Sequence, residues 1–186
     1  MNRVGFGFDV HPLVSGRPLV LGGVTVESDL GLLGHSDADV LAHAIGEALL
    51  GALALGDLGR HFPDSDERYR GISSLVLLRH VSELLAARDA RIVNVDATVL
   101  AQAPRLSARL PEMAKRVADV LGLAEERVSV KAKSPEGLGL VGRREGIAAM
   151  AVVSVEVPCG SRTPSPERRR SSSRSRLERS GCTCAG

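Results

Sequence analysis

The chain has 186 residues and a formal net charge of +2, and 44% of its residues are apolar and 2% aromatic. This length fits one ordinary domain with an appendage, and the scarcity of aromatic side chains argues against a stacking platform for single-stranded nucleic acid. No apolar run reaches the roughly 18 residues of a membrane span, and the N-terminal apolar run is too short for a secretory signal. We therefore expect no membrane segment.

The net charge averages two unlike parts of the chain. Residues 160–186 contain seven arginines and two glutamates, a net charge of +5, so residues 1–159 carry −3. The composition changes at Pro158, which predicts one domain at 1–158 and a disordered, Arg- and Ser-rich basic tail at 159–186. The tail is either an arm that touches RNA or becomes phosphorylated, or a dispensable extension, which is the simpler interpretation. Three cysteines give no disulfide framework, which favours a reducing cytoplasm.

Hydrophobic periodicity predicts the elements in chain order. Residues 2–9 form a core strand, and 17–28 form a short hairpin with its turn at Gly22-Gly23. A helix follows, with its N-cap at Ser36 or Asp37 and its end near Gly56. Next comes a polar loop at 60–71, then helices at 74–88 and 111–121 and strands at 91–102, 127–134 and 146–157. This order predicts an α+β fold, a mixed four-stranded sheet with helices packed on one face plus the small hairpin.

The segment GLGLVG, at residues 137–142, matches the glycine pattern of a dinucleotide-binding loop. Such a loop is followed by a helix, because the pyrophosphate sits on the N-terminus of that helix. Here the chain continues as a strand-like segment. We therefore interpret these glycines as part of a loop between two strands.

Two side chains at the end of the first strand suggest a metal site. Asp9 and His11 are two residues apart, so in a strand they point to the same face. His43 lies near the middle of the first long helix and could complete the group. One carboxylate and two imidazoles suit Zn²⁺ with one position left open for a substrate oxygen. A single helical histidine is more often structural, so spacing alone leaves this assignment open.

Four longer segments together resemble one protein family. They are GFDVHPL and residues 31–66, 94–106 and 128–152, which match in order and register over nearly all of residues 2–157. The chain is similar to the 2-C-methyl-D-erythritol 2,4-cyclodiphosphate synthases, lyases of the non-mevalonate isoprenoid pathway. The resemblance implies a homotrimer of α+β subunits with active sites at the interfaces. The implied reaction is attack of the substrate's 2-phosphate on the β-phosphate of its own cytidine diphosphate arm, releasing CMP.

The resemblance also implies two metals. Asp9, His11 and His43 match the zinc ligands of the family, with a β-phosphate oxygen as the fourth. Glu136 matches the single carboxylate that binds a second ion, Mg²⁺ or Mn²⁺, between the α and β phosphates. His35 and Ser134 match groups that stabilise the transferring phosphate.

Further positions match substrate contacts of the family. Asp57 corresponds to the carboxylate that accepts hydrogen bonds from the ribose, with Gly59 nearby, and residues 62–66 match a loop over the methylerythritol part. Residues 101–106 match the cytosine pocket, read by backbone groups. The complete set of implied substrate-binding residues is Ser36, Asp57, Gly59, Phe62, Asp64, Asp66, Ala101, Ala103, Arg105, Leu106, Lys133, Leu140 and Arg143.

Some details go beyond the resemblance or depart from it. Asp39 and Glu47 lie one helical turn on either side of His43, and we expect one of them to fix the His43 tautomer. Leu140 stands where some members have Phe, and Arg143 matches an arginine near the trimer axis, where some members bind isoprenoid diphosphates.

Two other functions stay open at this point. One is a trimeric small-molecule or RNA-binding protein without turnover, and the other is a zinc hydrolase, which lacks an obvious general base.

Overall fold

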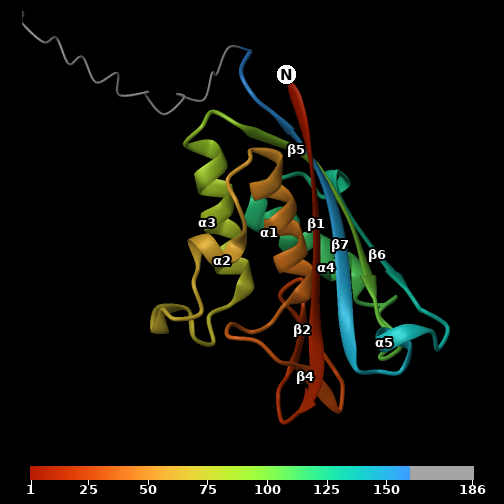
Figure 1. The fold of residues 1–186 in the computed structure, drawn as a ribbon. Helices are drawn as coiled ribbons and strands as arrows, with labels where there is room; N and C mark the ends of the chain where they lie inside the picture. Colours follow the sequence, from red (N-terminus) through yellow and green to blue (C-terminus); the bar gives the residue numbers. More distant parts are fainter. Residues whose placement is uncertain (160–186) are drawn as a thin grey trace, which may run out of the picture.

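The computed structural model describes residues 1–159, which form a sheet with helices on one face (Figure 1). The prediction of a separate basic tail falls almost wholly outside the described residues and stays a prediction. The strands are β1 (Asn2–Ser15), β2 (Leu19–Leu21), β3 (Val24–Val26), β4 (Leu30–Leu32), β5 (Arg91–Leu100), β6 (Val128–Lys133) and β7 (Gly146–Glu156). The helices are α1 (Val40–Ala52), α2 (Leu58–His61), α3 (Ser74–Ala86), α4 (Leu110–Leu121) and α5 (Gly139–Gly142), with short 3₁₀ turns at Glu67–Tyr69 and Glu125–Arg127.

The main sheet is mixed and has five strands, in the order β4-β1-β7-β5-β6. The pair β5 and β6 is parallel and is joined through α4, whereas the other pairs are antiparallel. The prediction of four strands was wrong because β1 does not end at Asp9. It continues to Ser15, and its last residues pair with the three-residue strand β4, from Leu13 opposite Leu32 to Ser15 opposite Leu30. The predicted hairpin is confirmed as the separate β2–β3 pair.

Two glycines in β1 allow α1 to lie directly against the sheet. A Cβ on Gly5 would come within 1.8 Å of the Ala48 carbonyl oxygen, and one on Gly7 within 2.0 Å of the Ala44 oxygen. Only a strand without side chains at these two positions permits this close approach. Because side chains alternate along a strand, Asp9 and His11 share the helix-facing side with the glycines. This packing brings α1, and with it His43, over the polar end of β1.

The opposite face of β1 is apolar and exposed. Val4, Phe6, Phe8 and Val10 are 70%, 63%, 52% and 40% exposed, and Val152 on the neighbouring β7 is 45% exposed. The expectation that the apolar residues of this strand lie in the core was therefore wrong for Val4, Phe6 and Phe8. The core itself contains Leu, Val, Ala, Ile and Met113.

The helices begin and end near their predicted positions, with one informative exception. The N-cap of α1 is Asp39, whose carboxylate accepts hydrogen bonds from the backbone N–H groups of Leu41 and Ala42, so the prediction of Ser36 or Asp37 was wrong. The helix also ends at Ala52, before Gly56. The segment 60–71, expected as a polar loop, contains the end of α2 and a 3₁₀ turn. Helix α4 ends at Gly122 in the left-handed conformation, as the sequence predicts.

The glycine-rich segment at 137–142 connects β6 to β7 through the four-residue helix α5. The strands it joins are not neighbours in the sheet, so no parallel β-α-β unit surrounds it. The interpretation as a connecting loop is confirmed. Within residues 1–159, none of the helices combines the length and apolar character needed to cross a membrane.

Candidate metal centre and substrate pocket

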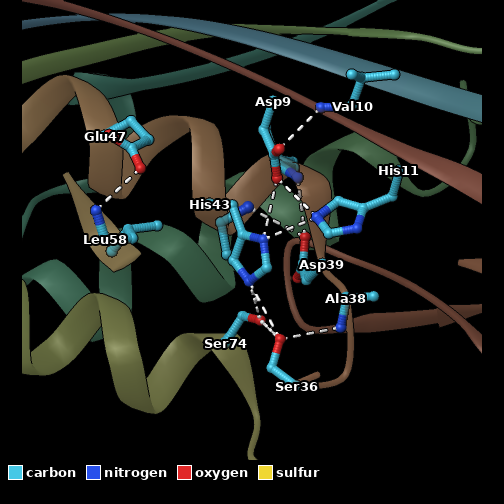
Figure 2. A network of polar contacts seen from close by, with 12 residues as sticks. Asp9, Val10, His11, Ser36, Ala38, Asp39, His43, Glu47, Leu58 and Ser74 are labelled. Atoms are coloured by element: carbon cyan, nitrogen blue, oxygen red, sulfur yellow. Dashed lines mark hydrogen bonds and ion pairs between the residues drawn. The ribbon is translucent and has the colours of Figure 1, made fainter. Parts of the chain in front are cut away.

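Asp9 and His11, in the second half of β1, come together with His43 in the first turn of α1 (Figure 2). Asp9 Oδ2 lies 2.8 Å from His11 Nε2 and 3.0 Å from His43 Nδ1, and the two ring nitrogens are 3.1 Å apart. Each of the three side chains is partly buried. The three residues expected as metal ligands on the sequence therefore form one compact group.

The hydrogen bonds around this group decide what it can bind. His11 Nδ1 lies 2.7 Å from the carbonyl oxygen of Leu33, which can only accept, so this nitrogen carries a proton and the lone pair of the neutral ring is on Nε2. Two imidazole nitrogens and a carboxylate oxygen then converge within 4.8 Å of one another. Such a set of acceptors requires a positive charge between them, either a proton or a metal ion. It fits a divalent cation.

The charge balance of the three groups supports this conclusion. Burial alone would raise the pKa of Asp9, but hydrogen bonds from His11 and His43 outweigh it and hold the carboxyl pKa well below its usual range. Burial would likewise lower the pKa of His11, but the hydrogen bond and charge of Asp9 raise it above the ordinary value. Asp9 is therefore an anion under ordinary conditions, and the site attracts cations.

The remaining nitrogen of His43 faces two hydroxyls. Nε2 lies 2.9 Å from Ser74 Oγ and 3.2 Å from Ser36 Oγ (Figure 2). The expectation that Asp39 or Glu47 would contact His43 was wrong, because both carboxylates bind backbone N–H groups. Asp39 accepts from Gly22 and Gly23 of the hairpin turn as well as from the start of α1, and Glu47 accepts from Leu58. Ser74 was missed because it lies on another helix, 31 residues further along the chain.

A cavity of about 230 Å³ opens beside the metal ligands. Of the residues expected to bind substrate, it is lined by His35, Ser36, Gly59, Phe62 and Asp64. The loop that contributes the last two is held by aromatic contacts. Phe62 meets Tyr69 edge to face at 5.4 Å between ring centroids and stacks on His80 at 6.1 Å.

Two expected ligands of this region do not line the cavity. Asp57 is exposed and caps α2 by accepting a hydrogen bond from the Arg60 N–H at 2.8 Å. Asp66 is paired with the Arg68 guanidinium and caps the following 3₁₀ turn. The carboxylate of Asp66 therefore has a local structural partner, whereas Asp64 faces the cavity.

Six of the other predicted residues line a second hollow, of about 410 Å³, where β5 and β6 end. The expected site residues in it are Ala101, Arg105, Leu106, Lys133, Ser134 and Glu136. Gln102 lies within the predicted 101–106 segment but was not selected as a site residue, and it organises this region. Its side-chain oxygen accepts from Gly137 N at 3.0 Å and from Ser134 Oγ at 3.4 Å. The residues of this hollow and those of the metal centre line different cavities.

Three further predicted residues lie outside both cavities. Ala103 lines a shallow hollow with Glu27 and Arg144. Leu140 is exposed on α5, and Arg143 directly after it is paired with Glu145. Within the described chain, neither Leu140 nor Arg143 contacts the metal centre.

The comparison with known proteins agrees with this geometry. Residues 2–156 match the model of the YgbB family. The chain belongs to the YgbB family. Within it, the 2-C-methyl-D-erythritol 2,4-cyclodiphosphate synthase of Pelotomaculum thermopropionicum is 59% identical over 153 residues, which cover 82% of this chain and 94% of the relative. The resemblance inferred from the sequence is confirmed.

Solved structures of family members share the fold. A bifunctional IspDF from Campylobacter jejuni superposes with a TM-score of 0.81 at 39% identity, covering 84% of this chain and 42% of that longer one. A 2C-methyl-D-erythritol-2,4-cyclodiphosphate synthase in a CDP-bound form superposes with a TM-score of 0.77 at 36% identity, covering 83% of this chain and all of that one. Neither comparison supports a non-catalytic binding protein.

Proposed function

We propose that the protein converts 4-diphosphocytidyl-2-C-methyl-D-erythritol 2-phosphate to 2-C-methyl-D-erythritol 2,4-cyclodiphosphate and CMP. The observation that carries this proposal is the convergence of Asp9, His11 and His43 beside a cavity, in a chain of the YgbB family. An oxygen of the substrate's 2-phosphate forms a bond to the β-phosphorus. The bond from that phosphorus to the bridging oxygen breaks, and CMP leaves with this oxygen.

The two metal ions would bind to different side chains. Asp9, His11 and His43 would hold Zn²⁺, which supplies positive charge and Lewis acidity next to the β-phosphate. Glu136 would hold Mg²⁺ or Mn²⁺ together with phosphate oxygens and water, the coordination that these ions prefer. Glu136 is exposed in its hollow, and its backbone N–H is tied to Ser134 Oγ at 3.1 Å.

The chain's own residues position the phosphates. The attacking 2-phosphate is already an anion, so the reaction needs no general base and depends on orientation and charge. His35 and Ser36 line the cavity beside the metal ligands and can donate hydrogen bonds to phosphate oxygens. Lys133 adds a positive charge and Ser134 a hydroxyl in the second hollow. Asp64 would bind the hydroxyls of the methylerythritol part and Asp57 those of the ribose.

We further propose a homotrimer in which two copies complete each site. The exposed apolar face of β1 and β7 supports an interface, because an isolated sheet rarely leaves two phenylalanines and several valines in water. The separation of the metal centre from the hollow around Glu136 supports it too, since one copy would supply the zinc ligands and the next the cytosine pocket and Glu136. Arg143 would then face the trimer axis.

We propose the cytoplasm as the compartment, because the three cysteines of the chain give no disulfide framework.

An activity assay tests the proposal. The purified full-length chain is incubated with the cytidine diphosphate substrate, Zn²⁺ and Mg²⁺, and both CMP and the cyclic product are measured. We expect both products in equal amounts, and a loss of about 100-fold or more in rate for His43→Ala. Asp89→Asn is the matched control, because Asp89 is exposed and its left-handed backbone suits Asn. No CMP release, or release that is unchanged by His43→Ala, would contradict the proposed function.

A further inference from the structure

The nitrogen of His43 that points away from the metal centre belongs to a small buried network. It joins Ser36 and Asp37, which lie directly before α1, to Ser74 at the start of α3. Ser36 and Ser74 are only 5% and 1% exposed, so water does not compete for their hydroxyls. Ser74 Oγ lies 2.9 Å from His43 Nε2 on one side and 2.5 Å from Asp37 Oδ1 on the other.

The position of each proton in this network follows from its neighbours. Asp37 Oδ1 accepts from both Ser74 N and Ser74 Oγ, so the single hydroxyl proton of Ser74 goes to Asp37 Oδ1. Ser74 Oγ is then an acceptor toward His43, and Nε2 must carry the proton that it accepts. Ser36 Oγ accepts from Ala38 N at 3.1 Å and donates to Ser74 Oγ at 3.1 Å. Every donor in this arrangement has an acceptor.

The other tautomer leaves a conflict. If Nε2 of His43 had no proton, two lone pairs would face each other at 2.9 Å, unless Ser74 turned its proton away from Asp37. That turn would place two oxygens 2.5 Å apart without a proton between them. A buried hydrogen-bond partner left unsatisfied costs about 1–3 kcal/mol, and more when it is charged. The network therefore selects one tautomer.

We propose that Asp37 and Ser74 form a positioning relay that fixes His43 in the Nε2–H tautomer and so keeps Nδ1 available as a metal ligand. The inference rests on the metal site of the proposed function and concerns how this chain prepares that site. Backbone groups strengthen the relay, because Asp37 Oδ1 also accepts from Ser74 N at 3.0 Å and Asp37 N donates to Ile72 O at 2.9 Å. The relay thus links the orientation of a ligand on α1 to the start of α3.

Zinc affinity of the full-length protein tests the relay without reference to turnover. It is measured by competition with a chromophoric chelator for the wild type, Ser74→Ala and the control Ser73→Ala. Ser73 is the exposed neighbour and makes no side-chain capping bond. Losing such an outer partner typically weakens metal binding about 10–100-fold, which we expect for Ser74→Ala, with Ser73→Ala unchanged. Zinc affinity of folded Ser74→Ala within twofold of the wild type would overturn the relay.

The tautomer can also be observed directly in the wild type, so the relay can be tested even if Ser74→Ala does not fold. Two-bond ¹H–¹⁵N correlation spectra of the zinc-free wild type are expected to show a proton on His43 Nε2, whether or not Nδ1 also donates to Asp9 Oδ2 at 3.0 Å. The Ser74→Ala spectrum should show the form that is protonated at Nδ1 alone as well. A wild-type His43 protonated at Nδ1 alone would overturn the relay. Wild-type protein that binds zinc and shows the Nε2–H form but releases no CMP would contradict the proposed reaction and leave the relay supported.

Discussion

At the scale of single residues, the metal centre depends on which nitrogen of each histidine is committed elsewhere. His11 uses Nδ1 for the Leu33 carbonyl, and His43 uses Nε2 for Ser74. Their remaining nitrogens therefore meet at the Asp9 carboxylate with lone pairs directed at one point. An imidazole that binds metal through one nitrogen is normally held in this way through the other.

Metal binding at His11 should depend on pH. Asp9 raises the pKa of His11 above its ordinary value of 6.5 in the metal-free protein, against the effect of burial. A proton and a zinc ion compete for the same nitrogen, so zinc affinity should fall by about tenfold per unit as the pH drops below this raised pKa. Chelator competition across a pH series measures the slope. An affinity that stays constant through the neutral range would contradict the assignment of His11 as a ligand.

The metal-free protein should show the opposite trend in stability. A histidine whose pKa is higher in the folded than in the unfolded state stabilises the fold below the unfolded pKa. This contribution is lost as the pH rises through the folded pKa. We therefore expect the stability that His11 contributes to the metal-free protein to decrease from pH 6.5 upward, whereas zinc increasingly stabilises the loaded protein over the same interval.

The ligand set could be predicted from the sequence, but its surroundings could not. The alternation of side chains in a strand places Asp9 and His11 on one face, and the family resemblance identified His43. The pairing of Ser74 with His43 depends on how α3 packs against α1, which no local pattern encodes. For the same reason the prediction that Asp39 or Glu47 contacts His43 was wrong. Spacing along a helix does not show which backbone N–H groups a carboxylate binds.

At the scale of elements, the contact between α1 and β1 holds the centre in place. Gly7 lies two residues before Asp9, on the same face of the strand, and has no room for a side chain because Ala44 O would be 2.0 Å from its Cβ. The hydrophobic periodicity of the sequence predicts both the strand and the helix. This periodicity does not predict how closely the helix packs against the strand, although glycines at alternate positions of a strand indicate close packing.

Gly7→Ala should separate α1 from β1 and disturb the zinc site with it. We expect a loss of about 3 kcal/mol in the free energy of unfolding, because backbone atoms of α1 must move, together with weaker zinc binding. Gly51→Ala is the control. Gly51 lies in the same helix, its Cβ would meet only Phe6 O at 3.8 Å, and alanine should stabilise the helix by about 0.5–1 kcal/mol. Denaturant unfolding and zinc content measure both effects, and equal behaviour of the two variants would refute the packing argument.

The turn that carries Glu136 offers a second test at this scale. Gln102 after β5 accepts hydrogen bonds from Gly137 N and Ser134 Oγ, which hold the turn after β6. Gln102→Ala should raise the Mg²⁺ concentration for half-maximal rate by about 2–10-fold, the range expected for one or two lost hydrogen bonds. Zinc affinity should not change, because the metal centre lies in another cavity. Ser107→Ala, in the same hollow but outside this turn, serves as the control, and a Mg²⁺ dependence identical in all three proteins would contradict the role of Gln102.

At the scale of the whole molecule, the predicted site residues of one chain are divided between two cavities. The metal centre with its cavity faces the helices, whereas Lys133, Ser134 and Glu136 line the hollow at the ends of β5 and β6. The outward face of β1 and β7 is apolar and exposed in the single chain. The fifth strand, missed because Gly31 interrupts a stretch of only three residues, extends the edge of this sheet.

If two copies build each site, variants defective in different halves should rescue each other. Asp9→Asn removes the carboxylate from the proposed zinc ligands, and Glu136→Gln removes the carboxylate proposed for the second metal, so each protein alone should be nearly inactive. The two variants are unfolded together at a 1:1 ratio and refolded. About one quarter of the sites in a closed ring should then combine the intact metal-ligand half of the Glu136→Gln chain with the intact second half of the Asp9→Asn chain. About one quarter of the wild-type rate should therefore return, with zinc content and oligomer size measured on the same sample. Mixing without refolding is the control and should restore nothing, whereas a refolded mixture that stays inactive despite forming mixed trimers would mean that each site belongs to one chain.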